Sequence, residues 1–291
     1  GYIANDKVKT SPPLIPLSDG AGVVVEVGDS VTRWAVGDRV MPCFFQDWVD
    51  GDLTRAQIST ALGGAIDGLL AERVALPEHG LVRIPNDYSF EQAATFPCAA
   101  VTAWQSLTSA NTRPGDTVLL LGTGGVSIFA LQLAKAFGAR VILTPSSDAK
   151  LERAKAMGAD EVINYRTTPQ WHEEALRLTG GEGVDHVLEV GGAGTLAKSM
   201  QATRVSGTVS LIGILSAPQD GNPSPLPALF NRLTIRGIYV GSRKMLEDLT
   251  RALVVNRIHP VIDRSFEFAE TVEAYRHLQS GKHFGKFTIV N

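Results

Sequence analysis

From Thr117 to Ile238 the chain alternates short apolar runs with segments whose apolar residues recur at helical spacing. The apolar runs predict six strands, at residues 117–121, 140–144, 161–164, 186–190, 208–213 and 233–238. The segments between them predict helices, for example at residues 149–157, 170–178 and 195–203. Apolar strands that alternate with amphipathic helices are typical of a parallel sheet covered on both faces. The sequence therefore predicts an α/β domain with a doubly wound six-stranded parallel sheet.

The first of these strands runs into a glycine-rich turn, Gly122-Thr123-Gly124-Gly125-Val126-Ser127, and a helical pattern follows it. Gly122 lets the chain turn sharply, Gly124 lets backbone N–H groups approach a pyrophosphate, and the helix start adds partial positive charge. The full fingerprint has a third glycine where this chain has Ser127. We expect Ser127 to loosen the helix–strand packing slightly and to place a hydroxyl near the pyrophosphate.

The turn by itself is a weak signal, because a tight turn without a ligand would have the same glycines. Six strands, however, complete a Rossmann dinucleotide-binding domain, and this context makes the turn specific. A methyltransferase also has a glycine-rich turn, but it normally has an acidic residue after the second strand and would not explain the β-rich region that precedes residue 86.

Before residue 86 the pattern changes to short β-rich stretches between glycines and prolines, which predicts a small barrel-like β domain. Its candidate strands are residues 22–28, 36–40, 69–76 and 81–85. Residues 44–64 form an irregular insertion around Trp48, either a functional lid or a surface loop. A capped helix is expected from Ser89, with a second helix after a break at Pro97.

After the sixth strand come two predicted helices, residues 243–256 and 269–279, and a final strand, residues 286–290. A tail this short is not an independent domain, so we expect it to pack on the N-terminal part. The predicted boundaries are 1–99 for the β domain, 100–241 for the Rossmann domain and 242–291 for the returning tail.

Composition narrows the classes of partner. The 291 residues are 44% hydrophobic with a formal net charge of −3, so no basic surface favours nucleic acid. A membrane span needs about 20 consecutive apolar residues, far more than any run here, which predicts no membrane partner. Cys43 and Cys98 are the two cysteines; they form neither a disulfide framework nor a four-thiolate zinc site. We expect a reducing, cytoplasmic compartment.

Five stretches together resemble the medium-chain dehydrogenase/reductase superfamily: residues 16–24, 36–40, 122–126, 158–165 and 284–286. The chain is most similar to the zinc-independent, quinone-oxidoreductase-like members, which are also alcohol dehydrogenase-like. The resemblance implies a chaperonin-cofactor (GroES)-like β domain with a Rossmann domain inserted into it. It also implies a strand and a pocket-lining stretch before Gly1, so these are missing here or the chain is a fragment.

The zinc ligands of the superfamily are not matched. Zinc-dependent members have Gly-His-Glu where this chain has Leu17-Ser18-Asp19, so Ser18 replaces the histidine ligand. Cys98 matches another catalytic zinc position, and the loop around Cys43 lacks the structural four-cysteine cluster. Because zinc needs about four N or S ligands, we expect no metal. By resemblance, Ser18, Asp19 and Cys98 border the substrate space and are the candidate catalytic residues. A structural turn at Asp19 and a small apolar role for Cys98 are the alternatives.

The cofactor prediction is NADP(H) over NAD(H). The second strand ends in Thr144-Pro145-Ser146-Ser147, without the carboxylate that usually binds a free ribose 2′-hydroxyl. Ser146 and Ser147 can donate hydrogen bonds to a 2′-phosphate, and Lys150 adds positive charge. The resemblance adds Tyr165 at the phosphate and adenine, although Tyr165 could be a wall residue and Lys150 a solvated one.

The resemblance also places residues at the nicotinamide end. It implies that Thr102 and Val126 pack near the ring and that the backbone of Gly213, Ile214 and Leu215 meets the carboxamide. Lys286 is assigned to the cofactor site as well.

The function predicted from these residues is hydride transfer from NADPH to a small-molecule quinone or α,β-unsaturated carbonyl. Without zinc no Lewis acid polarises an alcohol oxygen, so a substrate that needs little activation fits best, with the cofactor carrying the chemistry. A zinc-free NAD(P)-dependent alcohol or carbonyl dehydrogenase and a non-catalytic NADPH-binding protein are the alternatives. By resemblance we also expect a homodimer that pairs the sixth strand, residues 233–238.

Overall fold

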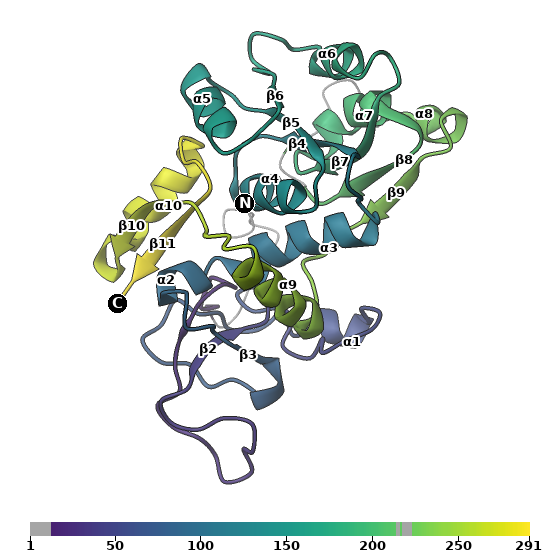
Figure 1. The fold of residues 1–291 in the computed structure, drawn as a ribbon. Coiled ribbons are helices and arrows are strands. Elements are labelled where there is room, and N and C mark those ends of the chain that lie inside the picture. The colour runs from purple at the N-terminus through teal and green to yellow at the C-terminus, as the bar shows by residue number, and fades with distance from the viewer. Residues whose placement is uncertain (1–12, 214–215, 217–222) are drawn as a thin grey trace. The chain divides into compact units, whose positions relative to one another are not determined.

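The computed structural model describes residues 13–213, 216 and 223–291, which form two compact units (Figure 1). The units are named here by their place in the sequence. The central unit comprises the described residues of Thr102–Tyr239 and His283–Gly285, and the terminal unit comprises the described residues of Gly1–Val101, Val240–Lys282 and Lys286–Asn291. Among the described residues, no helix is both long and apolar enough to cross a membrane.

The central unit contains the predicted six-stranded parallel sheet (Figure 1). The strands lie in the order β6-β5-β4-β7-β8-β9. Their bounds are β4 Thr117–Leu121, β5 Arg140–Thr144, β6 Glu161–Val162, β7 Val184–Glu189, β8 Thr203–Leu211 and β9 Thr234–Gly237. This is the order of a complete doubly wound dinucleotide-binding domain. The predicted fold class is confirmed.

Helices cover the sheet because successive strand residues point to opposite faces. The helices are α4 Gly125–Ala136, α5 Asp148–Ala156, α6 Trp171–Leu178, α7 Ala193–Ala202 and α8 Leu226–Phe230. Leu119 and Leu121 belong to a buried cluster with Trp171 of α6. Helix α4 packs against β4 and β5, and α6 packs against α7. These apolar layers hold the strand ends, and therefore the turns that follow them, in fixed positions.

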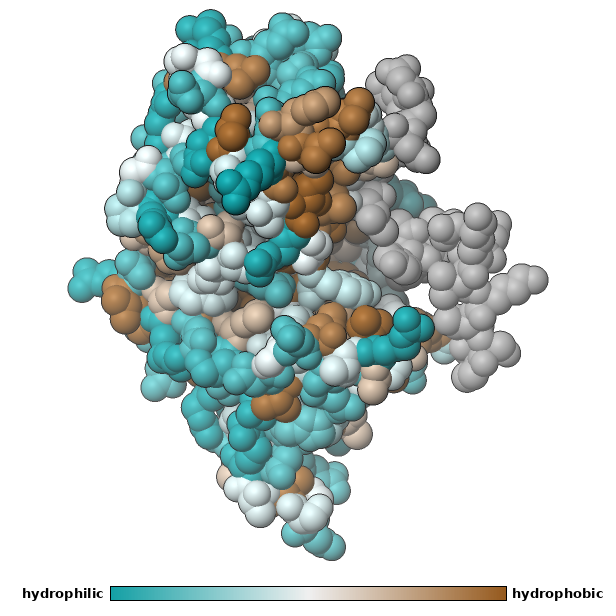
Figure 2. All heavy atoms as spheres, turned by 90° about the vertical axis from the view of Figure 1, so that its right-hand side faces the viewer, coloured by the Kyte–Doolittle hydropathy of each residue, from teal (hydrophilic) through white to brown (hydrophobic). Residues whose placement is uncertain are grey.

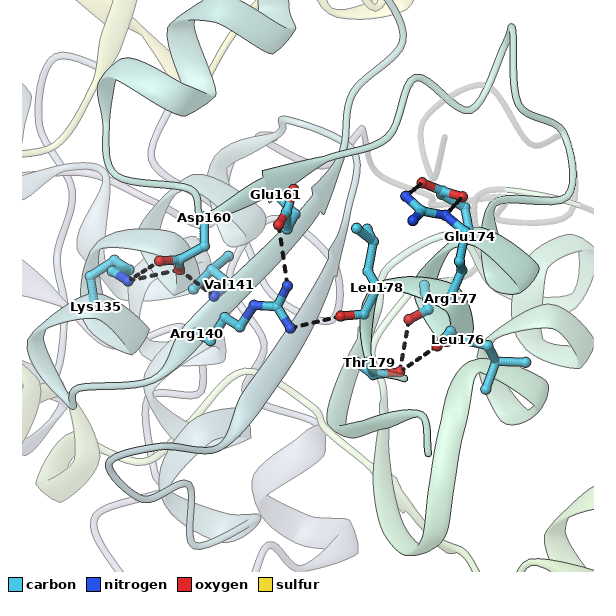
Figure 3. A network of polar contacts seen from close by, with 11 residues as sticks. Lys135, Arg140, Val141, Asp160, Glu161, Glu174, Leu176, Arg177, Leu178 and Thr179 are labelled. Carbon is cyan, nitrogen blue, oxygen red and sulfur yellow. Dashed lines mark hydrogen bonds and ion pairs between the residues drawn. The ribbon is translucent and has the colours of Figure 1, made fainter. Parts of the chain in front are cut away.

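A polar network fixes the amino end of β5 (Figure 3). Asp160 accepts a hydrogen bond from the Val141 backbone N–H at 2.7 Å and pairs with Lys135 at 2.7 Å. Burial raises the pKa of Asp160, but the bonds from Lys135 and Val141 outweigh this, so its pKa lies below the ordinary value. Arg140 bridges the Leu178 carbonyl and Glu161. The stretch around Asp160, one of those that carried the resemblance, thus has a structural role at the edge opposite the glycine turn.

His186 of β7 shows how the sheet buries a titratable side chain. It is 2% exposed, and its ring nitrogens contact the hydroxyls of Ser210 at 2.8 Å and Thr112 at 3.3 Å. Burial lowers the pKa of His186 to about 3. The ring is therefore neutral near pH 7 and acts as a hydrogen-bonded core residue.

The terminal unit combines both ends of the sequence. An antiparallel sheet contains β1 Gly22–Val23, β2 Arg39–Pro42 and β3 Leu81–Arg83, and a parallel pair contains β10 Ile262–Glu267 and β11 Lys286–Val290. Its helices are α1 Arg55–Ile58, α2 Phe90–Ala93, α9 Arg243–Val255 and α10 Thr271–Ser280. The Tyr88 hydroxyl donates to the Ile258 carbonyl at 2.9 Å, which joins the two chain segments. The described part of the tail belongs to the same compact unit as the N-terminal part, apart from His283–Gly285.

Helix α2 begins where the sequence predicted, with Ser89 and Gln92 forming a reciprocal capping box. The expected break at Pro97 is instead a π-helical turn, Phe96–Ala100, that leads directly into α3, Val101–Ser109. Proline fits there because the first positions of a helix need no N–H acceptor.

The strand predicted at residues 69–76 is wrong, because this segment hydrogen-bonds to the turn that precedes Ser18. Gly68 N–H donates to the Ile15 carbonyl at 2.7 Å, and Leu69 N–H donates to the Leu17 carbonyl at 2.9 Å. Leu17 has a positive φ of 71°, which is unusual for a residue with a side chain. The two segments therefore hold each other in a conformation that local preference alone would not select.

Gly68 makes this contact possible. A Cβ at Gly68 would overlap the Leu17 carbonyl oxygen and lie 2.5 Å from the Pro16 oxygen. A Cβ at Gly64 in the same loop would meet only the Ala61 oxygen at 3.9 Å, an ordinary contact.

We predict that Gly68→Ala lowers the free energy of unfolding by about 1–3 kcal/mol, as overpacking against backbone does. Gly64→Ala is the matched control and should change it by less than about 0.5 kcal/mol. Urea unfolding of both variants measures the difference. Equal stability of the two variants would show that the turn yields to a side chain at Gly68.

Candidate functional site

The turns that follow β4, β5, β7 and β8 lie at one edge of the central sheet. β4 pairs in parallel with β5 on one side and with β7 on the other, and β7 pairs with β8. Parallel strands bring their carboxyl ends to the same edge, and ligands of doubly wound sheets bind there. From β4 the chain continues to β5 and β6 on one side of the sheet and then crosses to β7, β8 and β9 on the other side. The glycine turn after β4 therefore lies at the point where the strand order switches direction.

The glycine turn has the geometry of a phosphate cradle. Gly122 has φ +69°, and its N–H donates to the Thr144 carbonyl at 3.0 Å. Gly124 is the N-cap of α4, and no side chain caps the helix start. A Cβ added at Gly122 or Gly124 would meet nothing within 4 Å. Backbone N–H groups at a helix start beside open space suit a pyrophosphate, so the residues present fit a dinucleotide.

The other residues of the turn are held by a backbone hydrogen bond from Gly285 and by the start of α4. Thr123 is buried, and its carbonyl accepts the Gly285 N–H at 2.9 Å. Gly125 and Val126 open α4, and both are half-buried.

Ser127 supports the turn differently from the expectation. Its side chain is 1% exposed, and its hydroxyl donates to the Leu121 carbonyl at 2.6 Å. The hydroxyl therefore fastens α4 to the end of β4 and does not loosen the packing. Its proton is used at Leu121, so Ser127 contributes to the cradle by fixing it. Direct contact of Ser127 with a cofactor stays a prediction.

The turn after β5 brings together several residues predicted for a 2′-phosphate. Ser146 and Ser147 are half-buried, and no side-chain bond caps the start of α5 at Ser147. Tyr165 is 39% exposed and its N–H donates to the Pro145 carbonyl at 3.2 Å, so the two turns adjoin. Lys150 is half-buried on the first turn of α5.

The first carboxylate after β5, Asp148, accepts the Asn164 side-chain amide at 2.9 Å. That bond engages one of its oxygens with a protein group next to Tyr165.

The structure describes some of the residues that are predicted to contact the nicotinamide. Thr102 is 2% exposed on α3. Gly213 follows β8, and its N–H donates to the Glu189 carbonyl at 3.0 Å. Ile214 and Leu215 lie outside the described residues.

The terminal unit brings Ser18, Asp19 and Lys286 together. The Ser18 hydroxyl donates to Asp19 Oδ1 at 2.7 Å, and Lys286 Nζ donates to Asp19 Oδ2 at 3.1 Å. Burial lowers the pKa of Lys286, but the nearby Asp19 and Cys98 raise it more, so its pKa lies above the ordinary value. Lys286 is therefore a cation at neutral pH. Its pairing with Asp19 of the predicted substrate group was not expected from the sequence.

The two cysteines differ in environment. Cys98 lies half-buried in the π-helical turn, a type of irregularity that is frequent at functional sites. Cys43 is 2% exposed, and burial raises its pKa to about 12. Since a thiolate is the form that binds metal, Cys43 is a poor ligand.

The donor set does not fit zinc. Within the part of the chain that the structure describes, no three His, Cys, Asp or Glu side chains gather as a metal site. The group around Asp19 offers a hydroxyl, one thiol and a carboxylate that an ammonium already neutralises. Zinc prefers several N or S donors.

The sequence interpretation missed Glu189, the last residue of β7, which is fully buried and accepts four hydrogen bonds. An ionisable residue at the end of an otherwise apolar run, followed by Gly191 and Gly192, was the available signal.

Comparison with known proteins gives the family. A model described as "Alcohol dehydrogenase GroES-like domain" matches residues 2–86, and one described as "Zinc-binding dehydrogenase" matches residues 125–254. A zinc-type alcohol dehydrogenase-like protein of Schizosaccharomyces pombe is 44% identical over 285 residues, which cover 95% of this chain and 82% of that protein.

Solved structures agree. A crystal structure of an NAD-dependent alcohol dehydrogenase has 35% identity and a TM-score of 0.86, covering 99% of this chain and 86% of that one. The quinone oxidoreductase of Coxiella burnetii has 28% identity and a TM-score of 0.79, covering 100% and 84%. The predicted family and the predicted enzyme class are confirmed: the chain belongs to the medium-chain dehydrogenase/reductase superfamily and is an NAD(P)-dependent oxidoreductase.

Proposed function

We propose that this chain is a zinc-independent, NADPH-dependent reductase of a quinone or an α,β-unsaturated carbonyl. One observation carries the proposal: Lys286 pairs with Asp19 at 3.1 Å, at the position where zinc-dependent members would keep metal ligands. An ammonium there disfavours a second cation by like-charge repulsion, and Ser18 is a poor ligand in the histidine position. The zinc in the names of the relatives therefore does not extend to this chain.

In this proposal the protein groups of each unit bind and orient the ligands. Ser18 and Lys286 both donate to Asp19, which holds the carboxylate in one place. The cradle of Gly122 and Gly124 would hold the cofactor's pyrophosphate through backbone N–H groups. A bound nicotinamide supplies the reducing equivalent, and a hydrogen bond or water supplies the proton. Substrates whose carbonyl is already conjugated need the least help from the protein, which is why quinones and enones fit best.

A zinc-free alcohol or carbonyl dehydrogenase is the second candidate. The names of two similar relatives favour it, since one is named an alcohol dehydrogenase and the other an alcohol dehydrogenase-like protein. The same donor set around Asp19 would serve it, so the choice between the two depends on the substrate that turns over.

The preference for NADPH is supported by the turn after β5. Ser146, Ser147 and Lys150 offer donors there, and the Asp148 carboxylate accepts a hydrogen bond from the Asn164 amide. A 2′-phosphate would meet two hydroxyls and an ammonium, and no carboxylate directly follows β5 in the position that usually binds a free 2′-hydroxyl. Since one relative is NAD-dependent, the argument for NADPH rests on these residues and not on the family.

We also propose that the chain acts in the cytoplasm as a homodimer joined through β9. This strand is at the edge of the sheet, and all four of its residues are exposed. Apolar side chains gather on the face that carries α8 and β9 (Figure 2): Leu229 is 70%, Phe230 76% and Ile235 41% exposed. An open edge beside an apolar patch suits a second copy of the same edge.

A substrate panel tests the activity. With NADPH, quinones and enones should be turned over, simple alcohols with NADP⁺ should react at least about tenfold more slowly, and a zinc chelator should leave the rate unchanged. Turnover of alcohols alone would select the second candidate. Cofactor binding without turnover would mean a binding protein, and loss of activity on chelation would refute zinc independence.

Lys150 tests the cofactor preference. Lys150→Glu should raise the KM for NADPH by at least about tenfold and that for NADH by less than about twofold, because only the former has a 2′-phosphate. Lys155→Glu on the same helix is the matched control, since Lys155 pairs with Glu152 and is exposed. Steady-state kinetics with both cofactors measure this, and equal effects of the two variants would overturn the assignment.

Sedimentation velocity tests the dimer. The wild-type chain should sediment at twice its 31.1 kDa mass, and Ile235→Lys should yield the monomer because a charged edge does not pair. Val255→Lys alters another exposed apolar residue and should leave the dimer intact. A monomeric wild-type protein would refute the proposal.

A further inference from the structure

Glu189 buries a carboxylate at the site edge of the central sheet. It is the last residue of β7 and is 0% exposed. Among the described residues, the hydrogen-bond partners of its carboxylate are uncharged donors, two backbone N–H groups and two hydroxyls. Burying a carboxylate is costly unless its oxygens are hydrogen-bonded. The bonds it makes are therefore strong and specific.

Both carboxylate oxygens are used within the turn that follows β7. Oε1 accepts the backbone N–H groups of Gly191 and Gly192 at 2.8 Å each and the hydroxyl of Thr195 at 2.6 Å. Oε2 accepts the hydroxyl of Ser199. Glu189 thus ties the turn and the first two turns of α7 to the end of its own strand. Gly192, which donates one of these bonds, has φ +98°, a conformation that favours glycine.

The same residue also holds the turn after β8. Its backbone carbonyl accepts the N–H groups of Ile212 at 2.9 Å and Gly213 at 3.0 Å. The Gly191 carbonyl accepts both the N–H and the hydroxyl of Ser216, at 2.9 and 2.8 Å, and the Ser216 hydroxyl accepts the Gly194 N–H at 3.2 Å. The two turns are thereby linked on both sides of Gly213.

The two turns interlock without spare room. A Cβ at Gly213 would overlap the Val190 carbonyl, and a Cβ at Gly191 would overlap the Thr195 hydroxyl and lie 3.2 Å from Glu189 Oε1. Packing this close transmits a displacement of one turn to the other. The position of the Gly213 backbone therefore depends on the bonds of Glu189.

We propose that Glu189 is a positioning residue for the nicotinamide end of the cofactor. Its buried carboxylate fixes the turn after β7, and through Gly191, Ser216 and its own carbonyl it fixes the Gly213 turn. This inference rests on the proposed NADPH-dependent function, together with the prediction that the Gly213 backbone meets the nicotinamide carboxamide. Glu189 acts through backbone and does not itself contact the cofactor.

The experiment compares two ligands that share one end. Adenosine 2′,5′-bisphosphate has the adenine and 2′-phosphate but no nicotinamide, whereas NADPH has both ends. Titration calorimetry of each ligand, with thermal unfolding and amide exchange at Gly191 and Gly192, separates positioning from general stability.

Glu189→Leu should lower the affinity for NADPH by at least about tenfold and the affinity for the bisphosphate by less than about threefold, because it leaves the two glycine N–H groups unpaired. Glu189→Gln should bind both within about threefold of wild type. Its amide oxygen can replace Oε1, and its amide nitrogen can donate to the Ser199 hydroxyl.

Ser199→Ala keeps the test valid if Glu189→Leu does not fold. It removes one hydrogen bond to Oε2 and should lower the affinity for NADPH by about threefold without changing the affinity for the bisphosphate. Ser210→Ala is the matched control, since Ser210 is equally buried but bonds to His186. It should lower stability similarly and leave the ratio of the two affinities unchanged.

The outcomes distinguish the inference from the function. Equal losses for NADPH and the bisphosphate, or no loss for NADPH, would overturn positioning by Glu189 while leaving a wild-type NADPH enzyme. A wild-type protein that binds neither NADPH nor NADH would overturn the proposed function, and with it this inference.

Discussion

The parallel pairing of β4 with both β5 and β7 is the constraint on which the candidate site depends. Val118 lies opposite Val141 on one side and His186 on the other, so the three strands end in step. Their turns then meet at one edge, where Gly122 bonds to Thr144 and Gly213 packs on Val190. The backbones of neighbouring turns approach so closely at this edge that a side chain has no room, which is why glycines are frequent there. A shift of one strand by a single residue would disperse the whole edge.

The carboxylates of Asp19 and Glu189 are stabilised in opposite ways. Asp19 is paired with an ammonium, which leaves a charged, partly exposed group next to a hydroxyl. Glu189 has only neutral donors among its described partners and is fully buried. The first arrangement suits contact with a polar ligand, and the second suits holding backbone in place. Both depend on neighbouring turns whose conformation is unusual, at Leu17 and at Gly192.

The regular elements could be predicted from the sequence, whereas individual side-chain and backbone contacts could not. The six strands, the glycine turn and the returning tail follow from hydrophobic period and turn chemistry, and all are present. Residues 69–76 have strand-like composition, yet N–H groups at the start of this segment bond to a neighbouring turn. No local sequence pattern predicts these bonds. The same holds for the Ser127 hydroxyl, the Lys286 pair and the four bonds of Glu189. Each depends on contacts between residues that are distant in sequence or on the direction of one side chain.

The terminal unit is assembled from the first and the last parts of the chain. Tyr88 bonds to Ile258, Ser265 to Glu91 and Lys286 to Asp19, so these contacts span between 170 and 267 residues. The central unit is nearly continuous and closes through neighbouring strands. Contacts of such sequence separation form slowly because a long loop must close first. During synthesis the strands of the central sheet are made one after another, whereas the N-terminal segment has to wait for β11 before it can make its contacts with that strand. The charged pair of Lys286 with Asp19 and the bond of Gly285 to Thr123 of the glycine turn both depend on one short segment, so the substrate group and the turn become complete at the same stage of synthesis.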